Sequence, residues 1–309
     1  MKLSTLVSDA SPCAICGEVT EWRFSTRRPV RFAGEVRNFK RCASCGSRSL
    51  TPMPSGLELS SLYGAEYNGD AVDEPGVEGD PRAYDWLMAH LNRVQPKRFV
   101  DYGCGSGALL KMVAASNIEA IGFDVTVSGV EAASLSSGCV VRTLADVDMY
   151  TGSADVVHLG DVLEHVPDPA EVLAQACTLL RPGGLLLAEG PMEANLSMFN
   201  GFLAITAYIQ GRKPVDVPPY HVHLSTARGQ LKLFERVMLT TEEFETSDIS
   251  WPAPDRWTRR IAASPRLSAL FVLRRFSTLI WAIAPDRLSR RMANRFRYSG
   301  TVTSSSEAN

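Results

Sequence analysis

The sequence predicts an α/β protein built on a doubly wound, mostly parallel sheet. Short β-like runs alternate with helical runs from residue 96 to about residue 250, and repeated strand–helix units favour parallel pairing. A glycine-rich loop at Gly103–Gly107 joins the first strand of this series to the first helix. Two Cys-x-x-Cys pairs precede the series and an arginine-rich helical pattern follows it. A small N-terminal module and a C-terminal helical region therefore flank the predicted sheet.

Hydrophobic periodicity and turn residues define the elements in order. A helix at Tyr84–Val94 is expected before the sheet, and Arg181–Gly184 is expected to stop a helix and turn. A loosely defined last strand is expected at Thr301–Ser304. The other expected strands are 98–101, 120–124, 140–144, 155–159, 185–189 and 242–247, and the other expected helices are 108–116, 129–136, 169–180 and 227–237.

Composition is that of a globular protein. The chain has 309 residues, 45% of them apolar, and a formal net charge of −2, which excludes a disordered chain, a collagen and a disulfide-dense mini-protein. The charge is uneven: Arg256–Arg297 contains eleven arginines and one acid, Asp286, for a net charge of +10. The rest of the chain is correspondingly acidic, at −12.

Four of the seven cysteines form two matched units, Cys13-Ala-Ile-Cys16-Gly and Cys42-Ala-Ser-Cys45-Gly. Two such pairs offer four thiolates to a tetrahedral Zn²⁺, and the glycine after each pair suits a tight turn. Four thiolate ligands leave no open position, so the predicted zinc site is structural. Four free buried thiols are the alternative, and zinc ribbons also occur in nucleic-acid-binding proteins.

The first residues, Met1–Cys13, contain no apolar run long enough for a signal peptide. The longest apolar stretch, Leu267–Ala284, carries Arg274 and Arg275 in its middle, a costly pair for a bilayer-spanning helix. We therefore expect a cytoplasmic protein.

The loop Val100–Gly107 lets the backbone turn sharply and approach a ligand closely. By itself it also fits a dinucleotide fingerprint, so an NAD-dependent oxidoreductase is an alternative. Asp101 stands two residues before the first glycine, where it would attract a cation and repel a pyrophosphate. Asp124 ends the second strand, where a carboxylate can accept both hydroxyls of a ribose. S-adenosylmethionine, a nucleoside with a cationic amino-acid arm, satisfies both acids.

Four motifs together resemble those of the class I S-adenosylmethionine-dependent methyltransferases and follow that family's order. They are Asp101-x-Gly103-x-Gly105-x-Gly107, Asp124, Asp161-Val-Leu-Glu164-His165-Val-Pro-Asp168-Pro169 and Leu180-Arg181-Pro182-Gly183-Gly184. The resemblance covers residues 96 to about 250 and implies a Rossmann-like sheet of seven strands, the last antiparallel. The cysteine pairs and the segment Leu62–Tyr67 are similar to a subgroup in which a zinc ribbon and a tyrosine-rich helix precede the catalytic domain.

The resemblance also implies roles for single residues. Asp101 is expected near the methionine end of S-adenosylmethionine and Asp124 at its ribose, although helix capping and a plain strand end are the respective alternatives. The remaining residues expected to line the cofactor are Gly103, Gly105, Gly107 and Asp161, with Asp146 near the adenine.

Histidines mark the expected acceptor side. A methyl transfer needs a general base when the acceptor is a hydroxyl, an amine cation or a carbon acid, and histidine suits that task near neutral pH. Pro218–Ser225 is similar to a segment of the subgroup's sugar C-methyltransferases, in which a Tyr-x-Glu-His arrangement carries the base. Tyr220 and His223 match, but Val222 replaces the glutamate. O-methyl transfer with His223 or His165 as the base is therefore preferred, and packing roles are the alternative.

Two apolar segments have open interpretations. Ala194–Gln210 is either a lid over a bulky acceptor or a core helix. Residues 256–297 form a basic amphipathic region that would lie on the inner face of an anionic membrane, beside a lipid-linked substrate, or dock on the acidic part of the chain itself. Nucleic-acid binding, including RNA methylation, is a weaker alternative.

The sequence thus predicts a zinc ribbon at 1–52, a connector with helices at 53–95, an S-adenosylmethionine-binding domain at 96–250 and a basic helical region with a tail at 251–309. The expected function is methyl transfer to a small molecule, a saccharide or a lipid-linked glycan. The sequence does not predict the oligomeric state.

Overall fold

The computed structural model divides the chain into two compact units. Unit 1 comprises Met1–Met53, Gly190–Arg236 and Phe244–Arg297, and unit 2 comprises Pro54–Glu189, Val237–Glu243 and Tyr298–Asn309. The described residues are 6–7, 11–62, 84–211, 213–216, 218, 220–247, 262, 264–283 and 286–302. The expected tyrosine-rich helix after Leu62 and the arginines between residues 256 and 260 lie outside them.

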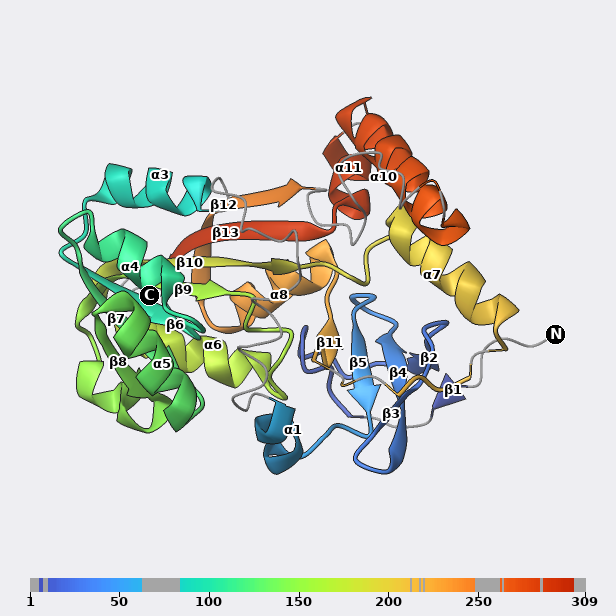
Figure 1. Ribbon diagram of the computed structural model, residues 1–309, viewed down its shortest axis with the longest axis horizontal. Coiled ribbons are helices and arrows are strands. Elements are labelled where there is room, and N and C mark those ends of the chain that lie inside the picture. The colour runs from blue at the N-terminus through green and yellow to red at the C-terminus, as the bar shows by residue number, and fades with distance from the viewer. Residues whose placement is uncertain are drawn as a thin grey trace. The chain divides into compact units, whose positions relative to one another are not determined.

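A seven-stranded sheet, mainly of unit 2, has the order β12-β13-β10-β9-β6-β7-β8 (Figure 1). β6 to β10 pair in parallel, and β13 runs opposite to them (Figure 1). The predicted Rossmann-like sheet with one antiparallel strand is confirmed. Its strands are β6 (Arg98–Tyr102), β7 (Glu119–Asp124), β8 (Val140–Thr143), β9 (Ala154–Gly160), β10 (Leu180–Pro191), β12 (Leu239–Ser247) and β13 (Arg295–Val302).

Helices of unit 2 pack on this sheet. Trp86 and Leu87 of α3 and Leu110 of α4 form one core with Phe99 of β6 and Val156 of β9, because apolar residues recur at helical spacing on one side and at buried strand positions on the other. The elements are α1 (Gly56–Leu62), α3 (Asp85–Val94), α4 (Ala108–Ala114), α5 (Val127–Ser137), the 3-10 helix η1 (Leu144–Tyr150) and α6 (Pro169–Thr178).

Two expected elements are wrong in detail. Arg181–Gly184, expected as a turn, is part of β10, whose register with β9 shifts between Leu180 and Leu185. This is a strand irregularity, which a glycine at positive φ permits. The last strand begins at Arg295 instead of Thr301, since Phe296 and Tyr298 are buried at alternate positions. The C-terminal helices therefore end before the last strand of the sheet.

Unit 1 holds a six-stranded sheet in the order β1-β2-β4-β5-β11, with β3 paired to β4. β11 comes from late in the chain and pairs antiparallel with β5. The elements are β1 (Leu6–Val7), β2 (Trp22–Phe24), β3 (Val30–Phe32), β4 (Glu35–Cys42), β5 (Arg48–Thr51), α7 (Met198–Ile209), β11 (His223–Leu224), α8 (Ala227–Arg236), α10 (Pro265–Ile283) and α11 (Asp286–Met292).

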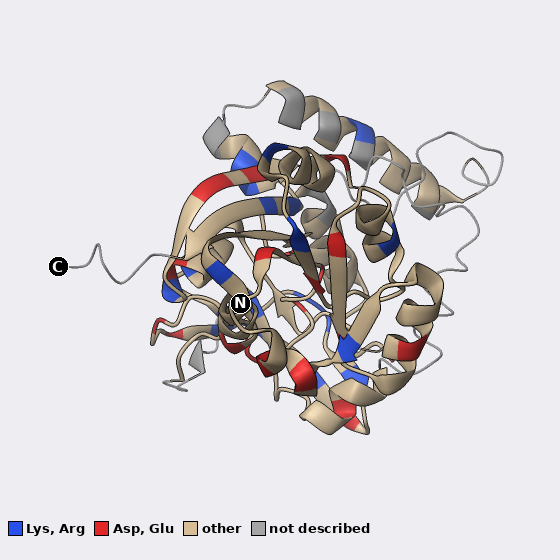
Figure 2. Ribbon diagram, turned by 90° about the vertical axis from the view of Figure 1, so that its left-hand side faces the viewer, with Lys and Arg blue, Asp and Glu red and all other residues tan. Residues whose placement is uncertain are grey.

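By its sequence, helix α10 contains three arginines and no acidic residue, and it packs against α7. Figure 2 shows basic and acidic residues interspersed along the described ribbon. Its apolar residues Val272, Phe276, Leu279 and Ile283 recur at helical spacing and are exposed. None of the helices in the described ranges has the length and apolar character that crossing a bilayer requires.

Candidate active site

The glycine loop follows β6 and turns through left-handed backbone at each of its glycines, with φ of +86° at Gly103, +50° at Gly105 and +76° at Gly107. A Cβ at Gly103 would come within 2.6 Å of Val162, and one at Gly107 within 2.8 Å of the Ala133 carbonyl oxygen. A Cβ at Gly105 would meet no atom within 4 Å. The two outer glycines thus allow close packing, and the middle one borders open space that a ligand can fill.

Asp124 lies at the carboxyl end of β7, directly beside that loop. Its Oδ2 accepts a hydrogen bond from the Gly105 backbone N–H at 3.0 Å, and its Oδ1 accepts one from the Val125 N–H at 2.7 Å. Burial raises the pKa of Asp124 above its ordinary value, and these backbone donors oppose the increase. The carboxylate is therefore fixed in position at the glycine loop.

A buried histidine, which the sequence analysis did not assign to the site, joins the next three strands of the sheet. His158 of β9 has its Nδ1 2.9 Å from Asp101 Oδ1 of β6 and its Nε2 3.8 Å from Glu189 Oε1 of β10. Burial opposes the charged imidazole, but the hydrogen bond to Asp101 and the negative charges of Asp101 and Glu189 raise the pKa of His158 to about 9. The imidazole is therefore protonated at neutral pH. Strand alternation alone places His158 in the core, and only the register with Asp101 reveals the pair.

Further acidic groups lie around this pair. Asp161 follows β9 with φ of +52°, and its N–H donates to the Glu189 carbonyl oxygen at 3.0 Å. Burial, and then the charges of Asp101, Glu189 and Asp161, raise the pKa of Tyr84 above its ordinary value. Asp101 and Glu189 flank one imidazolium, and Asp161 adds a further acidic residue beside Glu189, so negative charge exceeds positive charge among these groups. This excess favours a cationic ligand group.

Three other residues named by the sequence analysis lie elsewhere in unit 2. Asp146 is in the first turn of η1, after β8. Glu164 and His165 lie after β9, where Glu164 Oε1 is 3.7 Å from His165 Nε2. The roles expected for Asp146 and His165 stay predictions.

Tyr220 and His223 belong to unit 1. Only 1% of His223 is exposed, and its Nδ1 is 2.9 Å from the hydroxyl of Ser49, its partner in the β11–β5 pair. The structure thus gives His223 the surroundings of a packed strand residue, and its catalytic role stays a prediction. Tyr220 lines the pocket described next.

His221, two residues earlier, faces a different environment. Its Nδ1 is 2.7 Å from Glu193 Oε2, and Arg27 Nη2 is 3.2 Å from the other oxygen of the same carboxylate. Burial would raise the pKa of Glu193, but the hydrogen bonds and charges of His221 and Arg27 lower it to about 2. The carboxylate is therefore ionised at physiological pH and fixes the orientation of the imidazole.

This His221–Glu193 pair borders a pocket of about 860 Å³ in unit 1. Apolar side chains make up much of its lining, and Arg27, Glu193 and His221 form one ion-paired polar group on it. Such a combination suits a small molecule with an apolar body and one polar end. Part of the predicted lid segment, on α7, contributes to the wall. The lining residues used here are Arg27, Arg28, Phe39, Glu193, Phe202, Leu203, Tyr220, His221 and Leu224.

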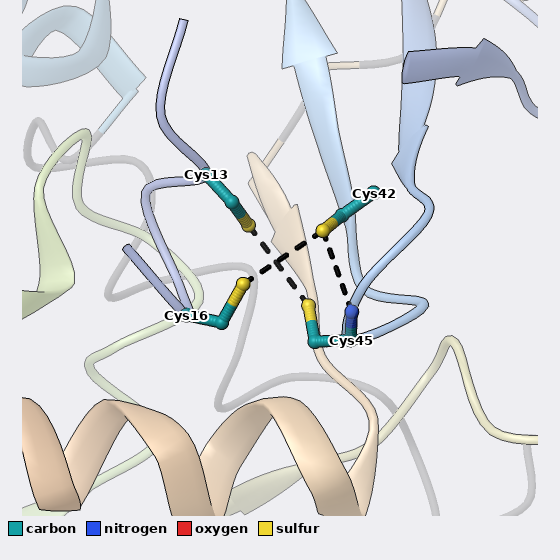
Figure 3. Close-up of side chains that lie close together, drawn as sticks. All are labelled: Cys13, Cys16, Cys42 and Cys45. Atoms are coloured by element: carbon teal, nitrogen blue, oxygen red, sulfur yellow. Dashed lines mark hydrogen bonds between the residues drawn. The ribbon is translucent and has the colours of Figure 1, made fainter. Parts of the chain in front are cut away.

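The four paired cysteines form one buried cluster with their sulfurs directed toward one another (Figure 3). The Sγ atoms of Cys13 and Cys45 are 3.9 Å apart, and those of Cys16 and Cys42 are 3.7 Å apart. A tetrahedral site with Zn–S bonds of about 2.3 Å requires sulfurs about 3.8 Å apart. The backbone N–H of Cys45 donates to Cys42 Sγ, and such bonds stabilise a thiolate. The cluster therefore fits a structural zinc ion.

Helix α8 packs on this cysteine module, a feature the sequence analysis did not predict. The Thr226 hydroxyl donates to the Cys45 carbonyl oxygen at 2.8 Å, and Arg236 donates to the Ala14 carbonyl oxygen at 2.6 Å. A Cβ at Gly229 would stand 2.1 Å from the Ser47 hydroxyl. The module is thus joined to residues 226–236 by close packing and by hydrogen bonds.

Comparison with known proteins agrees with this geometry. A family model described as a methyltransferase domain matches residues 81–235. Ubiquinone biosynthesis O-methyltransferases are 34% identical over 113 residues in Erwinia tasmaniensis (34% of this chain, 46% of the relative) and 35% identical over 140 residues in Ralstonia nicotianae (42% and 58%). The chain spans about half the length of the curated relatives it matches.

Solved structures resemble the fold more widely. The crystal structure of the [4+2]-cyclase SpnF aligns with a TM-score of 0.51 at 14% identity, covering 81% of this chain and 98% of that one. Because that protein is described as a cyclase, likeness of fold does not by itself determine the reaction.

Proposed function

The chain belongs to the methyltransferase domain family, and we propose that it transfers a methyl group from S-adenosylmethionine to an oxygen of a small-molecule acceptor. The observation that carries the proposal is the open space at Gly105 beside the fixed carboxylate of Asp124. A nucleoside seated there would place its ribose hydroxyls at that carboxylate. At Gly105 the loop would approach the ligand with backbone atoms alone.

The charges at the ends of β6, β9 and β10 support the same cofactor. Asp101 and Glu189 flank the imidazolium of His158, and the backbone N–H of Asp161 is bonded to the carbonyl oxygen of Glu189. The net negative charge suits the sulfonium and ammonium groups of S-adenosylmethionine, whereas the pyrophosphate of NAD would be repelled there. The geometry therefore favours the methyl donor over the nicotinamide alternative.

We further propose His221 as the general base. S-adenosylmethionine supplies, when bound, a methyl group on a cationic sulfur, so the chain's own residues must position the acceptor and remove its proton. In the tautomer in which His221 Nδ1–H donates a hydrogen bond to Glu193, the lone pair is on Nε2, and this nitrogen would take the hydroxyl proton. Tyr220, His223 and His165 remain the catalytic residues predicted from the sequence. Mutation must distinguish their roles from that of His221.

The acceptor class is proposed from the pocket and from the relatives. Phe39, Phe202 and Leu203 form apolar walls around the polar end at His221. The matched relatives are named as ubiquinone biosynthesis O-methyltransferases, which supports oxygen as the methylated atom. A saccharide or a lipid-linked glycan with an apolar portion also suits such a pocket.

We also propose that the cysteine cluster of unit 1 holds zinc as a structural ion, because the distances between its sulfurs match a tetrahedral thiolate site. Cytoplasmic location and contact of the basic helices with a membrane surface remain predictions from the sequence.

Titration calorimetry with S-adenosylmethionine and with NAD tests the proposed cofactor. We expect saturable binding of S-adenosylmethionine alone. Incubation of cell-extract fractions with a labelled methyl donor would then identify the acceptor. Binding of NAD without binding of S-adenosylmethionine would overturn the proposal.

A further inference from the structure

A second pocket of unit 1, of about 640 Å³, is lined by arginines. Among its described lining residues none is acidic. Hydroxyl and amide groups complete its polar surface. The arginines are Arg23, Arg41, Arg48, Arg228 and Arg291, and the other polar residues are Ser25, Thr26, Ser44, Asn195 and Thr226.

Three of these arginines form a row across the sheet. Arg23 of β2 is directly opposite Arg41 of β4, and Arg41 is directly opposite Arg48 of β5. Residues directly opposite in antiparallel strands project from the same face, and like charges so placed repel each other. Arg228 of α8 and Arg291 of α11 add two more charges to the same pocket. The fold therefore concentrates positive charge in this pocket, although like charges at such short spacing repel each other.

Nothing in the described part of the chain neutralises this row. None of the five guanidinium groups has an ion pair or a side-chain hydrogen bond to another described residue, and the Nε of Arg48 is buried with no hydrogen-bond partner. Burial, with the charges of Arg27 and Arg41, lowers the pKa of Arg48 to about 10. The charge of Arg48 is therefore held in an unfavourable environment.

Two carboxylates of unit 1 act on these arginines from a distance, and both already have partners. Glu193 is paired with Arg27 and His221. Glu18 is paired with Lys232 at 2.8 Å. Cys45 of the cysteine cluster also lines the pocket, and four thiolates around a zinc ion would carry a net charge of −2. Five arginines exceed that charge, so an anionic ligand would supply the compensation that the described residues do not.

We propose that this pocket binds the phosphate groups of a phosphate or diphosphate ester. Guanidinium groups bind phosphate oxygens through paired, charge-assisted hydrogen bonds, and hydroxyl groups add further donors. Five arginines exceed the charge of a single phosphate, so a diphosphate fits best. The pocket's volume is that of a site for one small ligand rather than of an extended nucleic-acid groove.

The ester bound in this pocket would also be the methyl acceptor. That identification rests on the proposed function, whereas the anion site itself does not. In that case the arginine pocket would hold the anionic end of the acceptor. The ester could be linked to a nucleoside or to a lipid, and the two sources share the diphosphate chemistry.

Calorimetry of the full chain with inorganic pyrophosphate at low salt tests the site. We expect saturable binding that weakens at least tenfold in Arg48→Gln and in Arg228→Gln, and that decreases as salt is added. Arg142→Gln, an exposed arginine of β8 in unit 2, is the matched control and should bind as the unsubstituted chain does. Since no described residue pairs with the Arg48 guanidinium, Arg48→Gln should unfold at an unchanged or higher temperature in the absence of ligand. Should that variant fail to fold, the exposed Arg228 gives the answer alone.

Two further ligands identify the source of the diphosphate. Tighter binding of ADP than of pyrophosphate would indicate a nucleotide ester, and tighter binding of farnesyl diphosphate a lipid ester; either result supports the site. Absence of pyrophosphate binding, equal binding by all variants, or binding of an RNA oligonucleotide without pyrophosphate binding would overturn it. S-adenosylmethionine binding, measured in parallel, reports on the proposed function separately.

Discussion

The polar groups of the two units differ in how their charges are compensated. At the carboxyl ends of the strands in unit 2, the carboxylates of Asp101 and Glu189 flank His158 and stabilise its protonated form. In unit 1, Arg23, Arg41 and Arg48 lie in a row without described carboxylate partners. In unit 2 the imidazolium compensates part of the carboxylate charge, whereas in unit 1 no described acidic group pairs with the row of arginines. The difference indicates that unit 2 is organised for a cationic ligand group and unit 1 for an anionic one.

Substitution of a clustered cysteine should have the largest effect, which is a loss of stability in unit 1. Cys42→Ser deletes one of four clustered ligands, so we expect zinc to be lost and the cysteine module to be destabilised by roughly 5 kcal/mol or more. Metal analysis and thermal unfolding measure both changes. Cys177→Ser, outside the cluster, is the control. A zinc-free unsubstituted protein would contradict the metal assignment.

Substitution of His221 tests the proposed base. Because Glu193 orients this imidazole, His221→Gln should lower turnover by about 10² to 10⁴-fold with little change in the affinity for S-adenosylmethionine. His223→Gln is the comparison, since His223 is buried against Ser49. A large loss of turnover in His223→Gln, with His221→Gln near normal, would restore the base predicted from sequence.

The buried imidazole of unit 2 predicts a pH dependence. The pKa of His158 is raised to about 9 from an ordinary 6.5, so its contribution is fully present below pH 6.5 and is lost as the pH rises through 9. The free energy of unfolding should fall by at most about 3 kcal/mol over that range. Chemical denaturation between pH 6 and pH 10 measures it. An identical pH profile in His158→Gln would contradict the assignment.

Asp124→Ala should have the smallest of these effects and should fall on cofactor binding. Loss of a carboxylate that accepts ribose hydroxyls should weaken S-adenosylmethionine binding by about 10 to 100-fold. Burial raises the pKa of Asp124, so this carboxylate is protonated at a higher pH than an ordinary aspartate. As the pH is lowered, binding of S-adenosylmethionine to the unsubstituted protein should therefore begin to weaken at that higher pH. Unchanged calorimetric affinity in a folded variant would remove Asp124 from the ribose site.

The sequence was informative where local patterns decide the structure. The alternation of strands and helices, the glycine loop and the end of β7 at Asp124 follow from periodicity and turn chemistry. The Cys-x-x-Cys spacing likewise predicted a four-thiolate cluster, which the structure contains. The sequence analysis missed the irregularity within β10. Proline and glycine at Arg181–Gly184 indicate a turn in the sequence, and only the structure shows that β10 pairs with β9 on both sides of them.

Contacts between segments that are distant in the sequence could not be predicted from local patterns. His221 and Glu193 are 28 residues apart, and Arg48 meets Arg41 only through the register of β4 and β5. Neither has a local sequence signal. His223 matched a family motif, yet its burial depends on the pairing of β11 with β5. Side chains that act in such pairs require the tertiary structure to be recognised.

The pairing of β11 with β5 means that the cysteine module cannot be removed cleanly. A truncated chain that began after Met53 would leave the backbone groups of His223 and Leu224 without their partners in β5. It would also expose the side of Gly229 that packs against Ser47. Unpaired strand edges and uncovered helix faces favour aggregation. The strand β11 thus depends for its pairing on a segment that lies 174 residues earlier in the chain.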